Sequence, residues 1–469
     1  MKPWGLVLGL ALLAPLPAAA QAPSLRPDQA AFREIYKELV ETNTSLSVGS
    51  CTEAAHKMGA RLKAAGFSDA DITYFAVPEH PKDGGVVAIL KGSDSKAGSV
   101  LLLGHLDVVE ARREDWTRDP FVMVEEDGFF YGRGTADMKG LDAIWVDTMI
   151  RLKQAKAPPK ATLKLALTCG EETSGAFNGA EWLAENRPDL VKADFGLNEG
   201  GGGRLDERGE RQSLSVQMGQ KIYQDYVLTA TNPGGHSSRP RPDNAIYELA
   251  DALEKIRAYA FPVKLTETTR AALAPRAQQD DPAGRALERL LADPADAEAA
   301  RVAMTDAGIN AVLHTTCTPT LLSAGHAPNA LPQRATANVN CRIMPGVSPQ
   351  AVRDVLAKVI DDPKITVDAP EADKPVAVDP PMNPKVVEPM RRLAAKHFPG
   401  VPLVPAMSSG ATDGIYFGRL GMPIYGVPGI FSEPDGNGAH GLDERMRARS
   451  LYEGRDYLFE LVKAYVGAK

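Results

Sequence analysis

Short apolar runs alternate with amphipathic segments along the first half of the chain. The runs are bounded by glycine or polar residues, a pattern typical of strands buried on both faces. The segments between them place apolar side chains three or four positions apart, as amphipathic helices do. We expect strands at Val86–Leu90, Val100–Leu103, Phe129–Tyr131, Thr162–Thr168 and Ala193–Leu197, and helices at Asp28–Thr42, Thr52–Ala65, Met138–Leu152 and Gly179–Asn186. Strands that alternate with helices predict an α/β fold with a mostly parallel sheet.

A different pattern begins near residue 219. Ile222–Thr231 alternates polar and apolar residues, and Val312–Leu322 and Ala335–Met344 are expected to pair as antiparallel strands. A helix after Asp243 and an alanine-rich helical stretch over 264–311 lie between them. This change predicts an inserted α+β domain comprising residues 219–378.

The chain returns to the first domain through Asp379-Pro380-Pro381. A helix at Val386–Phe398, a strand at Pro423–Val427 and a helix at Arg445–Tyr465 are expected to complete it. The α/β domain therefore comprises 21–218 and 379–469.

The N-terminus has the pattern of a secretory signal peptide. A basic start at Lys2 is followed by an apolar run, Leu6–Leu16, and by small residues up to Ala20. The run is too short to span a bilayer. We expect residues 1–20 to be removed and the mature protein to be secreted or periplasmic, without contact with the membrane.

Charge and cysteine content narrow the possible partners. The chain has 469 residues, 44% of them hydrophobic, and a net charge of −7, which argues against a nucleic-acid partner. An exported protein can form disulfides, and no CxxC spacing indicates a zinc site. If the two strands of the insert pair about Asn329, Cys317 and Cys341 face each other within disulfide range. A Cys317–Cys341 bond and two buried free thiols are equally weighted interpretations.

Five residues with metal-binding side chains fall just after predicted strands or at a helix start. They are His105, Asp137, Glu172, Glu199 and His440. In open α/β sheets ligands bind beyond the carboxyl ends of the strands, so these residues can converge. Two histidines and three carboxylates suit a pair of divalent ions, with one carboxylate as the bridge.

Two further carboxylates have expected roles beside these ligands. Adjacent Glu171 and Glu172 follow a buried strand, where one can bind metal while the other accepts a proton from the attacking water. Asp107, two residues after His105, is expected to accept the second ring N–H of that histidine and fix its tautomer. The simpler alternatives are that Glu171 and Glu172 form a solvated surface pair and that Asp107 is an ordinary turn residue.

The ordered motifs resemble the M20 family of co-catalytic zinc peptidases and amidohydrolases, which includes carboxypeptidase G2-like, carboxypeptidase S-like and acetylornithine deacetylase-like enzymes. The matching motifs are Gly104-His105-Leu106-Asp107, Gly134-Thr135-Ala136-Asp137-Met138-Lys139-Gly140, Glu171-Glu172, Asn198-Glu199-Gly200, Gly235-His236-Ser237-Ser238, Asn329-Ala330-Leu331-Pro332, Cys341-Arg342-Ile343-Met344-Pro345-Gly346 and Ala439-His440-Gly441. They span essentially the whole mature chain.

The resemblance implies a role for each matching position. His105 and Glu199 would hold one Zn²⁺, Glu172 and His440 a second, and Asp137 would bridge them, with Co²⁺ or Mn²⁺ as other possible metals. Glu171 would be the general base, and His236 would stabilise the oxyanion. Asn329 and Arg342 would bind the carboxylate side of the substrate, and Gly410 would line the same pocket. It also implies a zinc-exopeptidase catalytic domain with a lid and dimerisation domain, and hence a homodimer.

The predicted function is hydrolysis of an amide or peptide bond next to a carboxylate-bearing amino acid. The substrate would be a peptide or an N-acyl amino acid. A dipeptidase of the same family, a metal-dependent binding protein without activity, and a dinuclear phosphoesterase remain alternatives. The retained Glu171 disfavours the binding protein, and Arg342 disfavours the phosphoesterase.

Overall fold

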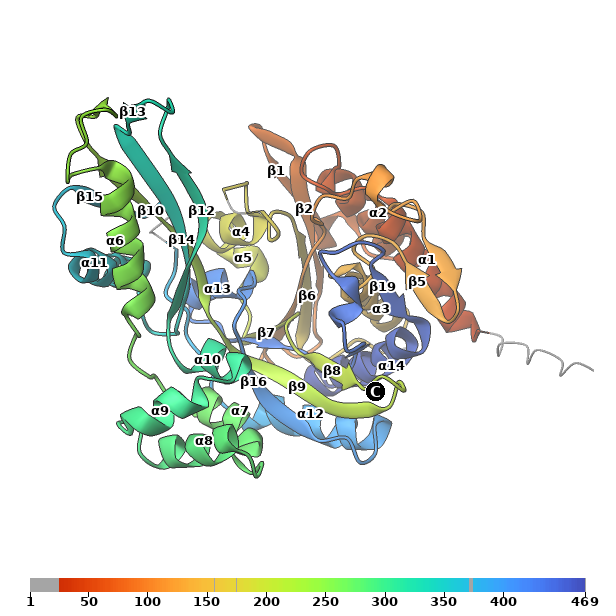
Figure 1. Ribbon diagram of the computed structural model, residues 1–469. Helices are drawn as coiled ribbons and strands as arrows, with labels where there is room; N and C mark the ends of the chain where they lie inside the picture. Colours follow the sequence, from red (N-terminus) through yellow and green to blue (C-terminus); the bar gives the residue numbers. More distant parts are fainter. Residues whose placement is uncertain (1–24, 156, 174, 371–373, 469) are drawn as a thin grey trace, which may run out of the picture.

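The computed structural model describes residues 25–155, 157–173, 175–370 and 374–468 (Figure 1). A large α/β part lies on one side and a smaller antiparallel sheet with two helices on the other. The predicted signal peptide, residues 1–20, lies outside the described residues. No helix in the described ranges is long and apolar enough to cross a membrane.

Ten strands of the described ranges form the main sheet. Its order is β1-β2-β6-β3-β7-β17-β9-β8-β18, with β16 beside β9. The central neighbours β6, β3, β7 and β17 are mutually parallel, as predicted, and antiparallel pairs occur toward both edges. The bounds are β1 Ile72–Val77, β2 His80–Leu90, β3 Ser99–His105, β6 Thr162–Thr168, β7 Phe195–Asn198, β8 Gly202–Leu205, β9 Arg211–Gln220, β16 Leu403–Ser408, β17 Ile424–Gly426 and β18 Phe431–Ser432.

Helices cover both faces of this sheet because its central strands are apolar on both sides. Along β3, Leu102 packs with one set of helices and its neighbours Leu101 and Leu103 with the other. The first set is α1 Pro27–Glu41, α2 Cys51–Ala64, α3 Lys139–Lys153, α12 Pro384–His397 and α14 Ala448–Val466; the second is α4 Gly179–Asn186, α5 Pro188–Val191 and α13 Gly414–Phe417. Figure 1 shows the second set on the side that faces the smaller sheet.

The smaller sheet forms what we call the lid. Its order is β12-β14-β10-β15, all antiparallel, and its helices pack on one face of it. The lid consists of β10 Ile222–Thr231, α6 Ala245–Ala258, β12 Thr316–Ala324, β14 Arg334–Ile343, α11 Pro349–Ile360 and β15 Ile365–Asp368. Only Lys221 separates β9 of the main sheet from β10, so the first crossing between the two parts is one residue long.

A four-helix segment lies within the predicted insert but packs elsewhere. It comprises α7 Glu267–Ala277, α8 Pro282–Ala292, α9 Ala297–Ala303 and α10 Ala307–Leu313, and it has a hydrophobic core of its own. Helix α7 packs against β16, and the Thr268 hydroxyl donates to the carbonyl of Met218 at 2.9 Å. This segment therefore rests on the main sheet, below the lid in Figure 1.

Two small sheets complete the described fold. One joins β4 Val124–Glu126, β5 Phe129–Tyr131 and β19 Arg445–Arg447. The other pairs β11 Gly235–His236 with β13 Ala330–Leu331 at the end of the lid, at the top of Figure 1.

Two disulfides tie the fold together. Cys317 of β12 and Cys341 of β14 face each other in register and are bonded, which confirms the predicted pairing. A second bond, between Cys51 and Cys169, joins the first residue of α2 to the residue after β6. This bond was not expected, because no spacing or hairpin relates two cysteines 118 positions apart.

Candidate metal centre

The carboxyl ends of the central parallel strands bring the candidate ligands together. His105 is the last residue of β3, Glu172 follows β6, and Glu199 follows β7. Asp137 lies just before α3, and His440 lies in the loop before β19. Parallel strands end at one edge of a sheet, so residues far apart in sequence meet there.

Two groups of three side chains share Asp137. His105 Nε2 lies 3.3 Å from Asp137 Oδ1 and 3.6 Å from Glu199 Oε1. His440 Nε2 lies 3.1 Å from Asp137 Oδ2 and 2.9 Å from Glu172 Oε2. Each group offers its ligand atoms within 4.8 Å of one another. Because each oxygen of Asp137 faces a different histidine, the arrangement fits two cations bridged by this carboxylate.

The electrostatics of the cluster favour bound positive charge. Burial raises the pKa of Glu199 to about 8. Burial, together with the charge of Glu199, raises the pKa of Glu171 well above its usual range. Hydrogen bonds to Asp137 and Glu172 raise the pKa of His440 to about 10. Buried carboxylates this close together need cations between them to be ionised at the same time.

The donor atoms fit a metal ion. His105 Nε2 is buried and makes no geometrically sound hydrogen bond within the described residues, although two carboxylate oxygens face it. A nitrogen lone pair with oxygen donors around it is what Zn²⁺, Co²⁺ or Mn²⁺ binds.

Asp107 does not make the contact that the sequence analysis expected. His105 Nδ1 lies 3.0 Å from the backbone oxygen of Asp107 and 3.7 Å from its carboxylate. The carboxylate instead accepts the backbone N–H of Glu172 at 3.0 Å. The peptide carbonyl thus orients the histidine, and the side chain holds the loop that carries both glutamates.

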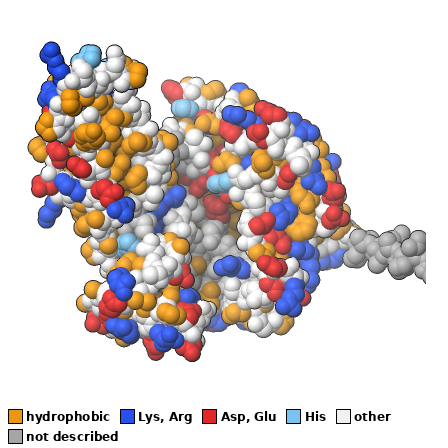
Figure 2. Space-filling view, viewed as in Figure 1, with side chains coloured by type: hydrophobic (Ala, Val, Ile, Leu, Met, Phe, Trp, Pro, Cys, Tyr) orange, Lys and Arg blue, Asp and Glu red, His pale blue; other side chains and the backbone are white. Residues whose placement is uncertain are grey.

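A cleft of about 740 Å³ opens in front of this cluster. Glu171, Glu172 and His440 line it from the α/β part, and Tyr223 and Arg342 line it from the lid. Figure 2 shows acidic side chains at the bottom of the hollow between the two parts. Arg342 therefore faces the same space as the candidate general base.

The other expected substrate residues lie outside this cleft. His236 belongs to β11 and is exposed, and its Nδ1 lies 2.8 Å from the Ser238 hydroxyl. Asn329 lies beside it, its carbonyl accepting the N–H of Ser237 at 3.0 Å. The N–H of Gly410 bonds to the Ser408 hydroxyl, and its neighbours Ala411 and Thr412, rather than Gly410 itself, line the cleft.

Glu444, which was not expected to belong to the site, is fully buried beside the candidate metal ligands. Its carboxylate accepts the N–H groups of Gly134, Ala136 and Asp137 at 2.9, 2.7 and 3.1 Å, and pairs with Arg133 at 2.7 Å. Glu444 thereby holds the turn that presents the bridging aspartate. Its position four residues after His440 is the only sequence signal that pointed to it.

Comparison with known proteins decides the family. Residues 101–464 match Peptidase family M20/M25/M40. The chain belongs to this family. It is therefore a hydrolytic enzyme of the M20 type, which confirms the resemblance inferred from the motifs.

Relatives of this M20 chain cover most of its length. It is 28% identical over 385 residues to the N-fatty-acyl-amino acid synthase/hydrolase PM20D1 of Homo sapiens, covering 80% of this chain and 75% of that protein. It is 28% identical to a probable carboxypeptidase S-like 2 of Dictyostelium discoideum, covering 80% and 73%. The crystal structure of the M20 family metallo-carboxypeptidase Sso-CP2 from Sulfolobus solfataricus superposes with a TM-score of 0.71 at 21% identity, covering 94% of this chain and 99% of that chain.

Proposed function

We propose that this enzyme uses two zinc ions to hydrolyse an amide bond next to a carboxylate-bearing amino acid. The observation that carries the proposal is the pair of ligand groups that share Asp137. His105 and Glu199 would hold one ion, Glu172 and His440 would hold the other, and Asp137 would contribute to both. Co²⁺ and Mn²⁺ satisfy the same donors.

Glu171 is the proposed general base. Bound metal lowers the pKa of a water to about 7 and polarises the scissile carbonyl. Glu171 accepts the proton of the attacking water and passes it to the leaving amine. Burial raises the pKa of Glu171, which makes its carboxylate a stronger proton acceptor.

The substrate side is proposed from the lid. Arg342 lines the cleft opposite Glu171 and carries the charge that a free carboxylate of the substrate needs. An exopeptidase of the carboxypeptidase type and an N-acyl-amino-acid hydrolase both meet this requirement. The names of the relatives, a carboxypeptidase S-like protein and an N-fatty-acyl-amino acid synthase/hydrolase, support both classes. A dipeptidase of the same family is the alternative.

The assembly is also part of the proposal. His236 and Asn329 lie together at the end of the lid, and neither lines the metal cleft of its own chain. A second subunit would bring them to the cleft, where His236 stabilises the oxyanion and Asn329 binds the substrate. We accordingly propose an exported homodimer.

One experiment tests the reaction. Metal-free protein is supplied with Zn²⁺, Co²⁺ or Mn²⁺ and assayed on dipeptides, N-acyl amino acids and a phosphodiester. We expect metal-dependent release of a free amino acid and no phosphodiester cleavage. Metal binding without turnover of any amide would support a binding protein, and phosphodiester cleavage would support a phosphoesterase.

A further inference from the structure

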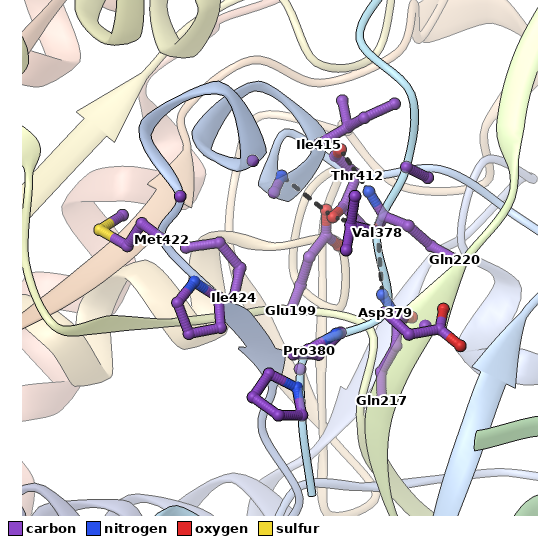
Figure 3. A pocket seen from close by; sticks show the side chains of 18 residues that line it. Glu199, Gln217, Gln220, Val378, Asp379, Pro380, Thr412, Ile415, Met422 and Ile424 are labelled. Carbon is purple, nitrogen blue, oxygen red and sulfur yellow. Dashed lines mark hydrogen bonds between the residues drawn. The ribbon is translucent and has the colours of Figure 1, made fainter. Parts of the chain in front are cut away.

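A second cavity is lined by Glu199, which is not among the residues that line the open cleft. Its volume is about 280 Å³, and Figure 3 shows the side chains that line it. Its walls come from three places: the end of β9, the segment 377–381 that leads back from the lid, and the stretch 412–426 around α13 and β17. It therefore sits where the two crossings between lid and α/β part meet the metal centre.

The walls of this cavity are mainly apolar. Eight apolar side chains and five glycines that line it are Ala377, Val378, Pro380, Pro381, Ile415, Met422, Pro423, Ile424, Gly219, Gly414, Gly418, Gly421 and Gly426. No lysine, arginine or histidine of the described chain is among the lining residues. An anionic group such as a phosphate would find no positive partner there.

Three polar residues in the wall, Gln217, Gln220 and Thr412, are hydrogen-bonded to one another. Gln220 Oε1 accepts from Thr412 Oγ1 at 2.7 Å and from Gln217 Nε2 at 3.1 Å, and Gln220 Nε2 donates to the Thr412 carbonyl at 3.1 Å. Thr266 and Thr268 lie close to the Asp379 carboxylate, and both oxygens of this carboxylate, like Gln217 Oε1, are buried without a clear hydrogen bond within the described residues. Apart from these oxygens and Glu199, the surface left for an occupant is mainly apolar.

The cavity adjoins the reaction site. Glu199, a proposed metal ligand, lines it, and its carboxylate lies 3.6 Å from His105 Nε2. Thr412 and Ile415 line both this cavity and the open cleft. These two residues therefore form a wall that the cavity and the open cleft have in common.

We propose that this cavity receives the unbranched hydrocarbon chain of an N-acyl amino acid, so that the enzyme selects long acyl chains over acetyl. The inference rests on the proposed amide hydrolysis and extends it to the acyl side of the substrate. At roughly 30 Å³ for each water-sized group, the cavity holds about nine such groups. Burial of each methylene is expected to raise affinity about fourfold until the cavity is full.

Val378 offers a way to fill the cavity without disturbing a packed core. Its side chain lines the cavity yet is 74% exposed, so a larger side chain meets open space. The indole ring of Val378→Trp should occupy cavity volume that the hydrocarbon chain of the substrate needs. Val122→Trp is the matched control, because Val122 is 47% exposed and lies outside the cavity.

The test uses the zinc-loaded full chain and two readouts. Calorimetry measures the affinity of straight-chain alkyl carboxylates with 2 to 12 carbons. It also measures the affinity of the same carboxylates with an ammonium group at the far end of the hydrocarbon chain. Kinetics measure kcat/KM for one amino acid acylated with the same chains. We expect both quantities to rise about fourfold per methylene and then level off, the rise to be largely lost in Val378→Trp, and Val122→Trp to follow wild type.

Three outcomes would overturn the inference. One is equal affinity at every chain length, the second an unchanged slope in Val378→Trp, and the third stronger binding of ammonium-ended chains. If the acetyl substrate is hydrolysed but kcat/KM does not change with acyl-chain length, the proposed reaction is retained and only the acyl site is rejected. A length gradient in binding without turnover of any amide overturns the proposed function, and the acyl assignment with it.

Discussion

At the scale of single residues, the site combines an excess of carboxylates with two histidines. Four of the five candidate ligands follow a recognisable strand or precede a recognisable helix, whereas His440 lies in the loop before β19. The contacts behind these ligands were not predictable from the sequence. Glu444 and the side chain of Asp107 act on backbone N–H groups, and such bonds leave no pattern in a sequence.

The adjacent glutamates allow the first prediction. Glu171→Ala is expected to keep both metals and to lower kcat by at least 10²–10⁴-fold, the usual contribution of general acid–base catalysis. Glu172→Ala should lose metal, because Glu172 is one of three ligands of its group. Metal analysis and steady-state kinetics on both variants check this. Normal metal content in both, with Glu171→Ala still active, would contradict the division of roles.

The buried carboxylate of Glu444 gives the second prediction. Glu444→Ala leaves Arg133 buried without its carboxylate partner and releases three backbone N–H groups. We expect a loss of about 3–5 kcal/mol in the free energy of unfolding and about 10–100-fold weaker metal binding. Urea unfolding and metal titration measure the two effects. Glu254→Ala, which removes an exposed pair with Arg257, is the control and should cost about 0–1 kcal/mol.

At the scale of elements, the apolar strands and amphipathic helices were predicted well and the polar strands poorly. The buried core strands stand out by composition, whereas β9 alternates Arg, Gln and Ser with apolar residues and was not expected as part of the main sheet. The hairpin of β12 and β14 was predicted with its register, although β12 begins at Thr316 rather than at Val312. The stretch before it forms α10, whose start is capped by Asp306.

The two disulfides give an element-scale prediction. Chain entropy predicts that the Cys51–Cys169 bond contributes more than the Cys317–Cys341 bond, because it closes a loop of 118 rather than 24 positions. The expected losses are about 5 and about 3.5 kcal/mol respectively. Urea unfolding of Cys51→Ser/Cys169→Ser and Cys317→Ser/Cys341→Ser checks the order. Peptide mapping that finds free thiols in the exported protein would remove the basis for it.

The crossing residue Lys221 gives a pH prediction. It is fully buried, its ammonium donates to the carbonyl of His314 at 2.5 Å, and burial together with the charge of Arg342 lowers its pKa to about 8. Between pH 8 and the ordinary lysine value near 10.5, the unfolded chain binds a proton that the folded chain does not. Stability from this group therefore rises with pH across that window, by about 3 kcal/mol.

Comparison with Lys221→Met isolates this contribution, because other groups titrate in the same range. The free energy of unfolding, measured by urea at pH 7 and pH 10, should increase more in wild type than in the variant. Equal increases in both proteins would show that Lys221 does not carry the effect.

At the scale of the whole molecule, the change of pattern at 219 and the return at 379 predicted that the chain leaves the sheet and comes back. Which part the helical stretch 264–311 packs against was not predictable. Its helices are amphipathic, but such a pattern states only that a face is buried and not against what. The structure places α7 on β16, so part of the insert supports the α/β part instead of the lid.

The position of His236 leads to the last prediction, which concerns two copies of the chain. His236 lies on β11 at the end of the lid, whereas the metal ligands lie at the edge of the main sheet. A donor acts on an oxyanion only from about 3 Å. In the proposed dimer His236 reaches the cleft of the other subunit, so each active site needs residues from both chains.

Mixing two inactive variants tests this arrangement. His236→Ala keeps Glu171, and Glu171→Ala keeps His236, so their heterodimer contains one complete site if His236 acts across the interface. After subunit exchange, verified by native mass spectrometry, activity should return to about half that of a wild-type dimer for each heterodimer. In a cis arrangement neither site is complete and no activity returns. Confirmed exchange without activity, or a stable monomer with full activity, would therefore show that His236 does not serve its neighbour.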